Sequence, residues 1–589
     1  MFTVFLIYIC IQIAGQSISI VHEHNLYPLW DPATHAFYGW KIYFTIIQLN
    51  PLNFLWEIWS KGLWPFMYYL FQAPFYFFTS YRFEASLFSS LFAFLCLGVL
   101  SCIFFNKTIK TSPIIAVGVF LLLLISSPVY IAFSTLSMTE IFGCLMQLLL
   151  FTTYILVTVS KSRKYAILFS VSLTLLFFTK YNYFILAVVP LIINEYILYT
   201  KNWTLKDHID FLFKSLKRIF SSLTGIVLVC YFIFLSVLIS TGGFEFHIFN
   251  QRVSVHSIGN TGYIVLYFLL IRFWLLRRKK KIDINGFLNK DFRIKPLINY
   301  FIIPLIVWFA IPYPNHIQEF FGLIVNRQSE GATLSSSFSF YFNILKNDYF
   351  QSSIVFYFTS LVFIIALLRF RSQAQMTKWL IIATLIQLFL VISHPYKDAR
   401  FIFTALLPLW LVASIEINSW ITKIKLNKIM IYLITLITIT IGLFIFQNAL
   451  HGDSFKKFAF SYYTESPELM NGFNKIRNQI NNDDKLVVIG SVNNILSPAL
   501  IEWEFGEPRG YKNFRGIITG SEYKKLNGAT HILIIAPLQN NNDTETLDSF
   551  NRHSKKIEEL FAEDKFQLLY EIDINDFRLS FRIYGTKKL

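Results

Sequence analysis

The sequence predicts a polytopic α-helical membrane protein with about 13 transmembrane helices and a C-terminal soluble α/β domain. Of its 589 residues, 55% are hydrophobic and 15% are charged, whereas a soluble domain carries roughly 25% charged residues. Apolar runs of about 20 residues, the length that crosses a bilayer core, recur over the first three quarters of the chain. These observations exclude a chain that is soluble throughout.

The first helix is expected from Phe2 to Ile20. This run has no positively charged n-region, so a retained helix is favoured over a signal peptide. The polar and aromatic segment 21–82 is expected to be the first extracytoplasmic loop, with helices at the membrane interface. The interfacial aromatic residues are Trp56, Trp59, Trp64, Tyr68 and Tyr69.

Further apolar runs predict the other spans. They begin near Phe83, Pro113, Ile141, Tyr165, Phe184, Ser222, Tyr263, Leu297, Ser352, Trp379, Phe401 and Ile429. Lysine and arginine gather in alternate loops, at 107–110, 161–164, 214–218, 277–281, 369–378 and 423–428. By the positive-inside rule these loops are cytoplasmic. An odd number of spans then places the opposite loops and the C-terminal domain on the extracytoplasmic side.

The net charge of +17 does not indicate a nucleic-acid partner, because the basic residues occupy short clusters between apolar runs, where cytoplasmic anchors lie. Membrane lipids are the expected surroundings. The Ile-, Lys- and Asn-rich composition favours a bacterial inner membrane over the endoplasmic reticulum. The cysteines lie in apolar runs without Cys-x-x-Cys spacing, so neither a disulfide framework nor a zinc site is indicated.

Residues 1–448 are expected to form the transmembrane domain and residues 449–589 an extracytoplasmic α/β domain. In the latter, β-like runs occur at 485–490, 531–536 and 566–570, with a helix-like stretch at 549–564. Neither a glycine-rich phosphate loop nor a nucleophile elbow occurs in its sequence. The domain is therefore expected to be accessory: a lid, an acceptor-docking surface or a partner contact.

Asp31 is the first candidate for chemistry, in the segment Leu29-Trp30-Asp31-Pro32. Aspartate followed by proline predicts a helix N-cap with proline at the first helical position. An aspartate near a membrane surface can also act as a general base when burial and neighbouring charges tune its pKa. The two roles are compatible, because a capping aspartate is held rigidly.

Glu140 and Lys180 lie on the same expected side. Glu140 opens an apolar helix, where the helix dipole favours an acid. Alternatively, Glu140 with His35 can bind a divalent cation such as Mg or Mn beside Asp31. Lys180 either extends along the apolar surface to the interface or holds a phosphate as a point charge.

His394, Lys397 and Arg400 are three basic residues within seven positions, on the side that the positive-inside rule leaves poor in such residues. This departure predicts an anion site. The arginine fork suits phosphate, and Asp398 can orient or partly neutralise the three.

These features together resemble the GT-C superfamily of membrane glycosyltransferases. The resemblance rests on Trp30-Asp31-Pro32 in the first loop, Glu140 before the fourth helix, the Thr179–Tyr183 segment (TKYNY) and His394–Phe401 with Pro408. The Thr179–Tyr183 segment is similar to a segment of bacterial relatives of protein O-mannosyltransferases. The segment His394–Phe401 with Pro408 looks like the His-Lys-Glu-x-Arg-Phe segment of dolichol-phosphate-mannose-dependent mannosyltransferases. By architecture, the resemblance covers about 450 residues.

The resemblance implies an inverting glycosyltransferase that uses a polyprenyl-phosphate-linked sugar donor. Its acceptor would be a hydroxyl of a lipid, a glycan or a protein. Asp31 would deprotonate this hydroxyl. Lys180, His394, Lys397 and Arg400 would stabilise the leaving phosphate.

Two other functions are compatible with a polytopic chain. A transporter or flippase of a lipid-linked anion is expected to show internal repeats and ionisable residues near helix midplanes, and no clear repeat is present. A non-catalytic membrane scaffold would need neither the long polar first loop nor the basic residues of 394–400.

Overall fold

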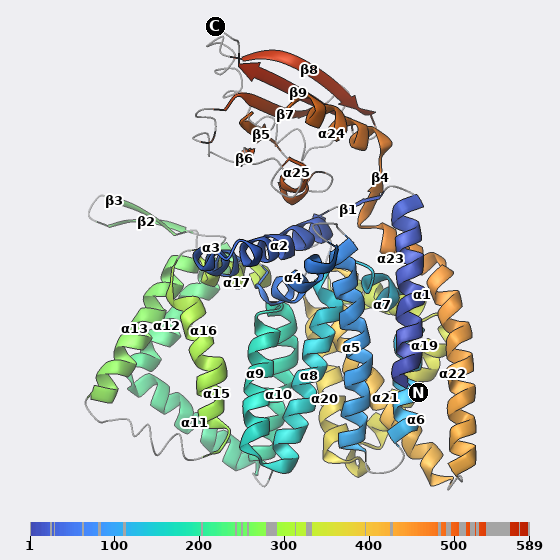
Figure 1. Ribbon diagram of the computed structural model, residues 1–589. Helices are drawn as coiled ribbons and strands as arrows, with labels where there is room; N and C mark the ends of the chain where they lie inside the picture. The colour runs from blue at the N-terminus through green and yellow to red at the C-terminus, as the bar shows by residue number, and fades with distance from the viewer. Residues whose placement is uncertain are drawn as a thin grey trace.

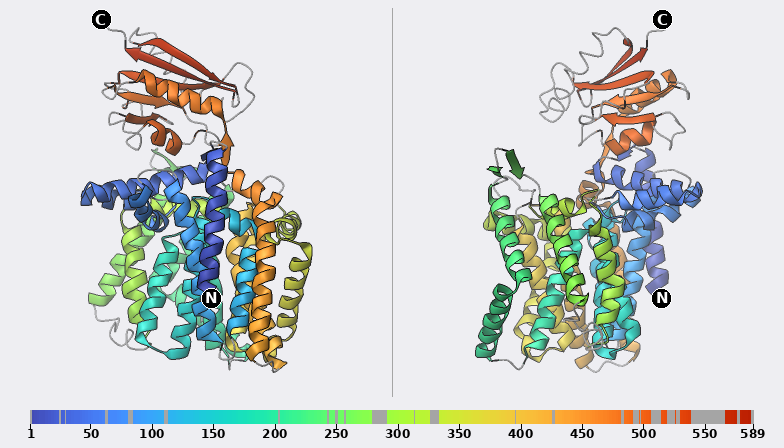
Figure 2. Two further views of the ribbon diagram at one scale, coloured as in Figure 1. Left: turned by 45° about the vertical axis from the view of Figure 1, so that its right-hand side comes forward. Right: turned by 90° about the vertical axis from the view of Figure 1, so that its left-hand side faces the viewer.

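The computed structural model describes residues 2–23, 26–28, 30–61, 64–79, 84–109, 113–201, 204–241, 244–248, 251–255, 258–278, 291–312, 314–325, 333–394, 396–424, 428–480, 484–490, 496, 498–505, 514–518, 525, 529–537, 566–575 and 578–586. Long helices stand side by side in a bundle, short helices cross one end of it, and a sheet unit lies beyond that end (Figure 1). Two further views show the same three layers (Figure 2). The described helices therefore agree with the expected polytopic fold.

Among the described residues, five helices are long and apolar enough to cross a membrane. They are α5 (Glu84–Thr108), α8 (Thr139–Ser160), α10 (Tyr181–Tyr199), α20 (Gln375–Ser393) and α21 (Phe403–Lys423), the last together with the short helix η4 (Ala399–Ile402). The helical run α18 (Leu334–Ile344) with η2 (Leu345–Tyr349) and α19 (Ser353–Leu368) form a sixth candidate, bent by 119°. Each expected apolar run coincides with a helix, but the count of thirteen spans is not confirmed.

The remaining long elements complete the bundle. They are α1 (Phe2–Glu23), α6 (Pro113–Ile125), α7 (Pro128–Phe133), α9 (Arg163–Phe177), α11 (Leu205–Ser221), α12 (Leu223–Thr241), α13 (Ile258–Arg278), α15 (Ile294–Leu297), η1 (Ile298–Ile302), α16 (Ile303–Ala310), α17 (His316–Val325), η3 (Phe370–Ser372) and α22 (Lys428–His451). A hairpin of β2 (Phe244–Ile248) and β3 (Gln251–Val255) extends from the same end as the sheet unit (Figure 1).

The centre of the bundle is formed by α8 and α21, each with 83% of its most apolar window buried inside the protein. Gly143 of α8 allows α10 to approach closely, since a Cβ atom there would lie 2.1 Å from the Tyr183 ring. This close approach brings the first turns of α8 and α10 together. Those turns carry Glu140 and Lys180.

Three helices lie across the end of the bundle: α2 (Trp30–Ile47), α3 (Pro51–Trp59) and α4 (Met67–Thr79) (Figure 1). Asn50 caps α3, because its side chain accepts the Asn53 backbone N–H at 3.0 Å. The Tyr76 hydroxyl of α4 donates to the Ala36 carbonyl of α2 at 2.7 Å. Leu52 of α3 is exposed, as expected for a helix at an interface.

The C-terminal sheet unit has five strands in the order β6-β5-β7-β9-β8. The strands are β5 (Leu486–Ile489), β6 (Phe514–Ile518), β7 (His531–Pro537), β8 (Phe566–Ile574) and β9 (Leu579–Thr586). β5 is parallel to β6 and β7, whereas β9 is antiparallel to β7 and β8. Helices α24 (Pro467–Gln479) and α25 (Pro498–Phe505) supply apolar residues to its core.

The three strands expected in this unit are present as β5, β7 and β8, whereas β6 and β9 were not predicted. The helix expected at 549–564 lies outside the described residues. Strand β5 ends at Gly490, whose φ of +91° is a conformation that glycine adopts without steric cost.

A short segment joins the bundle to the sheet unit. Helix α23 (Asp453–Phe460) packs against the bundle core through Phe455 and Phe458. It is followed by β4 (Tyr463–Glu465), which pairs with β1 (Leu26–Pro28) just before α2.

Candidate functional site

Five charged side chains converge at the end of the bundle beneath α2. They are Asp31 of α2, Glu140 of α8, Lys180 at the N-cap of α10, and Asp398 and Arg400 beside η4. We refer to them as the Asp31 cluster. The four elements are distant in sequence, so only the tertiary fold brings these residues together.

Asp31 lies in the first turn of α2, because the helix begins at Trp30. The helix begins two residues before the expected Pro32, so the expectation that Asp31 is the N-cap is wrong. Its carboxylate instead accepts Arg400 Nη1 at 2.5 Å. Burial acts to raise the pKa of Asp31, but the charges of Arg400, His35 and Lys180 together with the Arg400 hydrogen bond outweigh it, and the pKa lies below its ordinary value. Asp31 is consequently ionised at neutral pH.

Arg400 is held by its own turn. Its Nε and Nη2 donate to Asp398 Oδ2 at 2.8 and 2.6 Å, and its backbone N–H donates to Asp398 Oδ1 at 2.9 Å. The hydroxyls of Tyr341 and Tyr349 donate to the backbone carbonyls of Asp398 and Ala399. This Asp-x-Arg turn anchors the Nε and Nη2 edge of the guanidinium and leaves Nη1 directed at Asp31.

Lys180 Nζ donates to Glu140 Oε1 at 2.8 Å, and the Glu140 side chain is fully buried. The alternative that Lys180 extends to the interface is therefore wrong, since its side chain is turned inward. The expected position of Glu140 in the first turn of a long helix is confirmed. Its other carboxylate oxygen, Oε2, is buried without a hydrogen-bond partner among the described residues.

His35 is buried one turn after Asp31, and its Nδ1 lies 3.0 Å from the Tyr69 hydroxyl. Burial lowers its pKa to about 4, against the opposing charges of Asp31 and Glu140. No group of three His, Cys, Asp or Glu side chains with the geometry to hold a metal occurs in the described part of the chain. Lys180 contacts Glu140 Oε1 and leaves Glu140 Oε2 without a partner among the described residues, so the expected metal role of Glu140 and His35 stays a prediction.

His394 and Lys397 lie on the approach to the cluster. The Tyr396 backbone N–H donates to His394 Nδ1 at 3.1 Å, and Lys397 Nζ donates to the Ser336 hydroxyl at 2.7 Å. His394 also lines a cavity of about 190 Å³ between α10 and α20. The lining residues are Asn182, Ile185, Leu186, Leu390, Val391, His394 and Phe401.

The four cations expected to bind phosphate thus fall into two pairs. Arg400 and Lys180 already contact carboxylates. His394 accepts the Tyr396 backbone N–H beside an apolar cavity, and Lys397 donates to the Ser336 hydroxyl. Three carboxylates and two cations give the Asp31 cluster a net charge of −1.

Sequence reasoning missed two residues of this region. Lys61 is buried, donates to Glu57 Oε2 at 2.7 Å and lies 3.8 Å from the centre of the Tyr38 ring. The i, i+4 spacing of Glu57 and Lys61 was the available signal. Tyr462 lies 5.9 Å from Arg400 Cζ, and no local pattern in the sequence indicates this contact.

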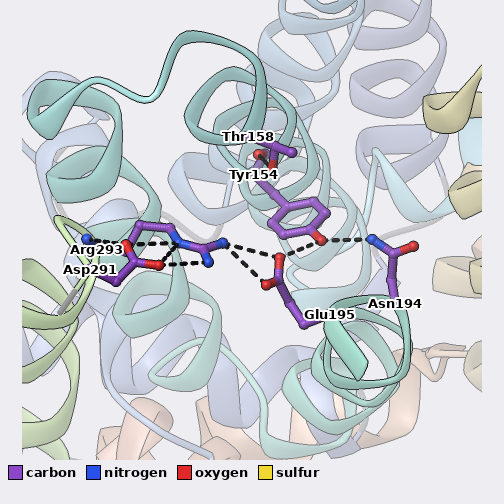
Figure 3. Close-up of polar contacts among 6 residues, drawn as sticks. All are labelled: Tyr154, Thr158, Asn194, Glu195, Asp291 and Arg293. Carbon is purple, nitrogen blue, oxygen red and sulfur yellow. Dashed lines mark hydrogen bonds and ion pairs between the residues drawn. The ribbon is translucent and has the colours of Figure 1, made fainter. Parts of the chain in front are cut away.

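A second Asp-x-Arg turn lies directly before α15, at the end of the bundle away from α2 (Figure 1), and Figure 3 shows its contacts. Arg293 Nη2 donates to Asp291 at 2.8 Å, and Nη1 donates to Glu195 at 3.1 Å. The Tyr154 hydroxyl donates to Glu195 at 2.8 Å and accepts from Asn194 at 2.7 Å. We refer to these five residues as the Arg293 network. Tyr154 follows Glu140 by 14 residues on α8, a separation of about 21 Å along the helix.

No family model and no curated protein matches this sequence. Solved structures do. ArnT from Cupriavidus metallidurans in the apo state matches with a TM-score of 0.55 and 10% identity, over 98% of this chain and 97% of that chain. The same protein bound to undecaprenyl phosphate gives a TM-score of 0.54, with the same identity and coverage. The chain therefore has the same overall fold as these two structures of ArnT.

An oligosaccharyltransferase from Archaeoglobus fulgidus matches more weakly, with a TM-score of 0.46 and 11% identity over 90% of this chain and 69% of that chain. This score is too low to support a shared fold by itself.

Proposed function

We propose that this chain is an inverting glycosyltransferase that moves a sugar from a polyprenyl-phosphate-linked donor to an acceptor hydroxyl. The reaction takes place at the end of the bundle that carries the Asp31 cluster, on the extracytoplasmic face of a bacterial inner membrane. Residues 1–448 supply the catalytic domain, and residues 449–589 form an extracytoplasmic α/β domain above it.

The observation that carries the proposal is the Asp31 cluster itself. A partly buried carboxylate with a lowered pKa stands beside Arg400 and Lys180, at the end of an apolar bundle with the ArnT fold. Perturbed ionisable groups that converge in a cleft are typical of active sites. A structural ion pair needs one partner, whereas Asp31 is influenced by Arg400, Lys180 and His35.

The donor phosphate fits best beside His394 and Lys397. The cavity that His394 lines is mostly apolar and suits the first part of a prenyl chain. Lys397 Nζ donates to the Ser336 hydroxyl, and a phosphate oxygen is a suitable acceptor for the same ammonium group. That ArnT was solved bound to undecaprenyl phosphate supports a lipid phosphate as the ligand of this fold.

Arg400 connects the phosphate site with the base. Its guanidinium is shared between Asp31 and Asp398, and a phosphate on the 394–400 segment would compete with Asp31 for Nη1. Weakening of the Arg400–Asp31 pair raises the basicity of Asp31 when the donor is bound. A base with a pKa nearer to the working pH is more effective.

The step is a single displacement at the anomeric carbon. The acceptor oxygen forms the new glycosidic bond while its proton passes to the Asp31 carboxylate. The bond between the anomeric carbon and the phosphate oxygen breaks, and its electron pair stays on the phosphate. Arg400, Lys180, Lys397 and His394 stabilise this developing charge.

The proposal is tested by measuring transfer from radiolabelled polyprenyl-phosphate sugars to a membrane extract. Purified protein in nanodiscs is compared for wild type, Asp31→Asn and Asp291→Asn. Because a general base typically contributes about 10²- to 10⁴-fold, we expect Asp31→Asn to lose at least about 100-fold in rate. Asp291→Asn removes an equivalent arginine-paired aspartate from the Arg293 network and should stay within about threefold of wild type.

Equal transfer by wild type and Asp31→Asn would sink the role of Asp31 as the base. Movement of the labelled lipid across the membrane of proteoliposomes, without any transfer of sugar, would identify a transporter instead.

A further inference from the structure

Tyr462 belongs to the segment that leads into the sheet unit, yet its ring lies in the Asp31 cluster. Its ring centre is 5.9 Å from Arg400 Cζ and 5.8 Å from the Phe133 ring. A guanidinium within about 6 Å of an aromatic ring is in the range of a cation–π contact. The contact bridges residues 62 positions apart in the chain.

The backbone on both sides of Tyr462 is fixed. Before it, α23 is tied to η2, because Lys457 forms an ion pair with Asp348 at 3.0 Å and Ser454 donates to the same side chain. After it, β4 pairs with β1 in the register Tyr463 opposite Pro28. The backbone at Tyr462 is therefore held on both sides.

The same sheet unit holds α2, the helix that carries Asp31. Glu502 of α25 forms an ion pair with Lys41 of α2 at 3.1 Å. Ala33, two residues after Asp31, is buried in the apolar core of the sheet unit. The segment that joins the bundle to the sheet unit thus contacts Arg400 through Tyr462, while the sheet unit contacts α2, the helix that carries Asp31.

The orientation of Arg400 matters because its donors are divided. Nε and Nη2 are directed at Asp398, and Nη1 at Asp31. A rotation of the guanidinium can keep the Asp398 contacts while it releases Asp31. The Tyr462 ring opposes such a rotation sterically.

We propose that Tyr462 is a positioning residue that keeps Arg400 Nη1 on Asp31 and so couples the docked C-terminal unit to the reacting carboxylate. This inference rests on the proposed function, in which Asp31 is the base. It gives the C-terminal unit a role in the reaction, in place of a purely accessory one.

A pH profile separates positioning from simple structural support. The charged and titratable groups that face Asp31 are Arg400, His35, Lys180, Tyr69 and Tyr462. When Arg400 turns away, Asp31 loses its nearest cation and its pKa rises. The acid limb of kcat/KM, which requires ionised Asp31, then moves to higher pH.

The experiment uses full-length protein in nanodiscs and compares Tyr462→Leu, Tyr462→Phe and Phe458→Leu. The Phe458 ring also packs on the Phe133 ring, at a distance of 6.4 Å between their centres. Phe458→Leu therefore removes a neighbouring ring that contacts the same residue as Tyr462. We expect Tyr462→Leu to raise the acid limb by roughly one pH unit, which lowers kcat/KM by about tenfold at pH values on that limb. Tyr462→Phe keeps the ring and should match wild type. Phe458→Leu should leave the acid limb in place.

A second measurement does not depend on sugar transfer. Hydrogen–deuterium exchange of the peptide 396–402 should speed up in Tyr462→Leu and not in Tyr462→Phe, because the Arg400 amide is bonded to Asp398. If wild type transfers no sugar, the proposed function fails, and exchange alone decides whether Tyr462 holds this turn. Unchanged exchange, or an acid limb that moves equally in Phe458→Leu, overturns the inference.

Discussion

The two ends of the bundle each carry an Asp-x-Arg turn, but the surroundings of the two turns differ. In both, an arginine binds the aspartate two residues before it and reaches with Nη1 to a carboxylate on another helix. The Arg400 side chain is 10% exposed and its distant partner Asp31 is 20% exposed, against 33% for Arg293 and 39% for Glu195. The cluster of Arg400 is therefore the more deeply desolvated of the two.

The neighbours differ as well. Around Arg400 stand Lys180, Glu140 and His35, with a cavity at the adjacent His394. Around Arg293 the additional contacts come from Tyr154 and Asn194, which extend a chain of hydrogen bonds from Glu195 (Figure 3). An Asp-x-Arg turn is thus a structural clamp by itself. Convergent charge, burial and an adjacent cavity are what make one of the two a candidate active site.

The largest test of this comparison replaces each arginine by alanine. Removal of one partner from a buried ion pair costs about 3–5 kcal/mol, whereas exposed pairs contribute roughly 0–1 kcal/mol. We expect Arg400→Ala to abolish transfer and to lower the free energy of unfolding in detergent micelles by several kcal/mol. Arg293→Ala should change that free energy by about 1 kcal/mol or less and keep activity.

Arg400→Lys serves as a matched control, since it keeps one positive charge without the fork. Comparable losses of transfer in Arg400→Ala and Arg293→Ala would show that the two turns are equivalent, contrary to the comparison.

A middle-sized effect is expected from His35, because the Arg293 network contains no histidine. The pKa of His35 falls from 6.5 to about 4 on burial, which corresponds to roughly 3 kcal/mol at most. The unfolded chain binds this proton below pH 6.5 and the folded chain only near pH 4. His35 therefore contributes stability that is present above pH 6.5 and is lost as the pH falls toward 4.

Unfolding free energies of wild type and His35→Gln, measured from pH 7.5 to 4.5, check this sign. His35→Gln should reduce the loss of unfolding free energy as the pH falls. His451→Gln, which removes an exposed histidine, should not reduce it. Parallel curves for wild type and His35→Gln would contradict the buried neutral imidazole.

The smallest effect concerns Tyr154→Phe in the Arg293 network. The buried Asn194 amide loses its acceptor, and a buried donor left unpaired costs about 1–3 kcal/mol. We expect the melting temperature to fall slightly and the transfer rate per folded molecule to stay at the wild-type value. A rate that drops more than the folded fraction would mean that this network also serves the reaction.

Much of the fold was predictable because the signals are local. A membrane-spanning helix must bury its own backbone polar groups, so length and apolarity predict it. The β-branched run of β7 similarly predicted a buried strand. By contrast, β6 and β9 gave no such signal, since their pairing depends on neighbours in the sheet.

The candidate site was predictable in membership but not in pairing. Counting spans placed Asp31, Glu140, Lys180 and Arg400 on one side, and the structure brings these four together. The sequence did not indicate which cation pairs with which carboxylate. Lys180 was assigned to phosphate, yet it pairs with Glu140, because Gly143 allows α10 to approach α8 closely.

The sequence by itself determined the apolar bundle, the interfacial aromatic helices and the candidate residues, since hydropathy and charge bias are properties of single segments. Only the tertiary structure decided that Arg400 binds Asp31 and that Tyr462 stands against it. These contacts join residues 369 and 62 positions apart. Pairing over such distances is fixed by packing of whole elements, and no local pattern of residues encodes it.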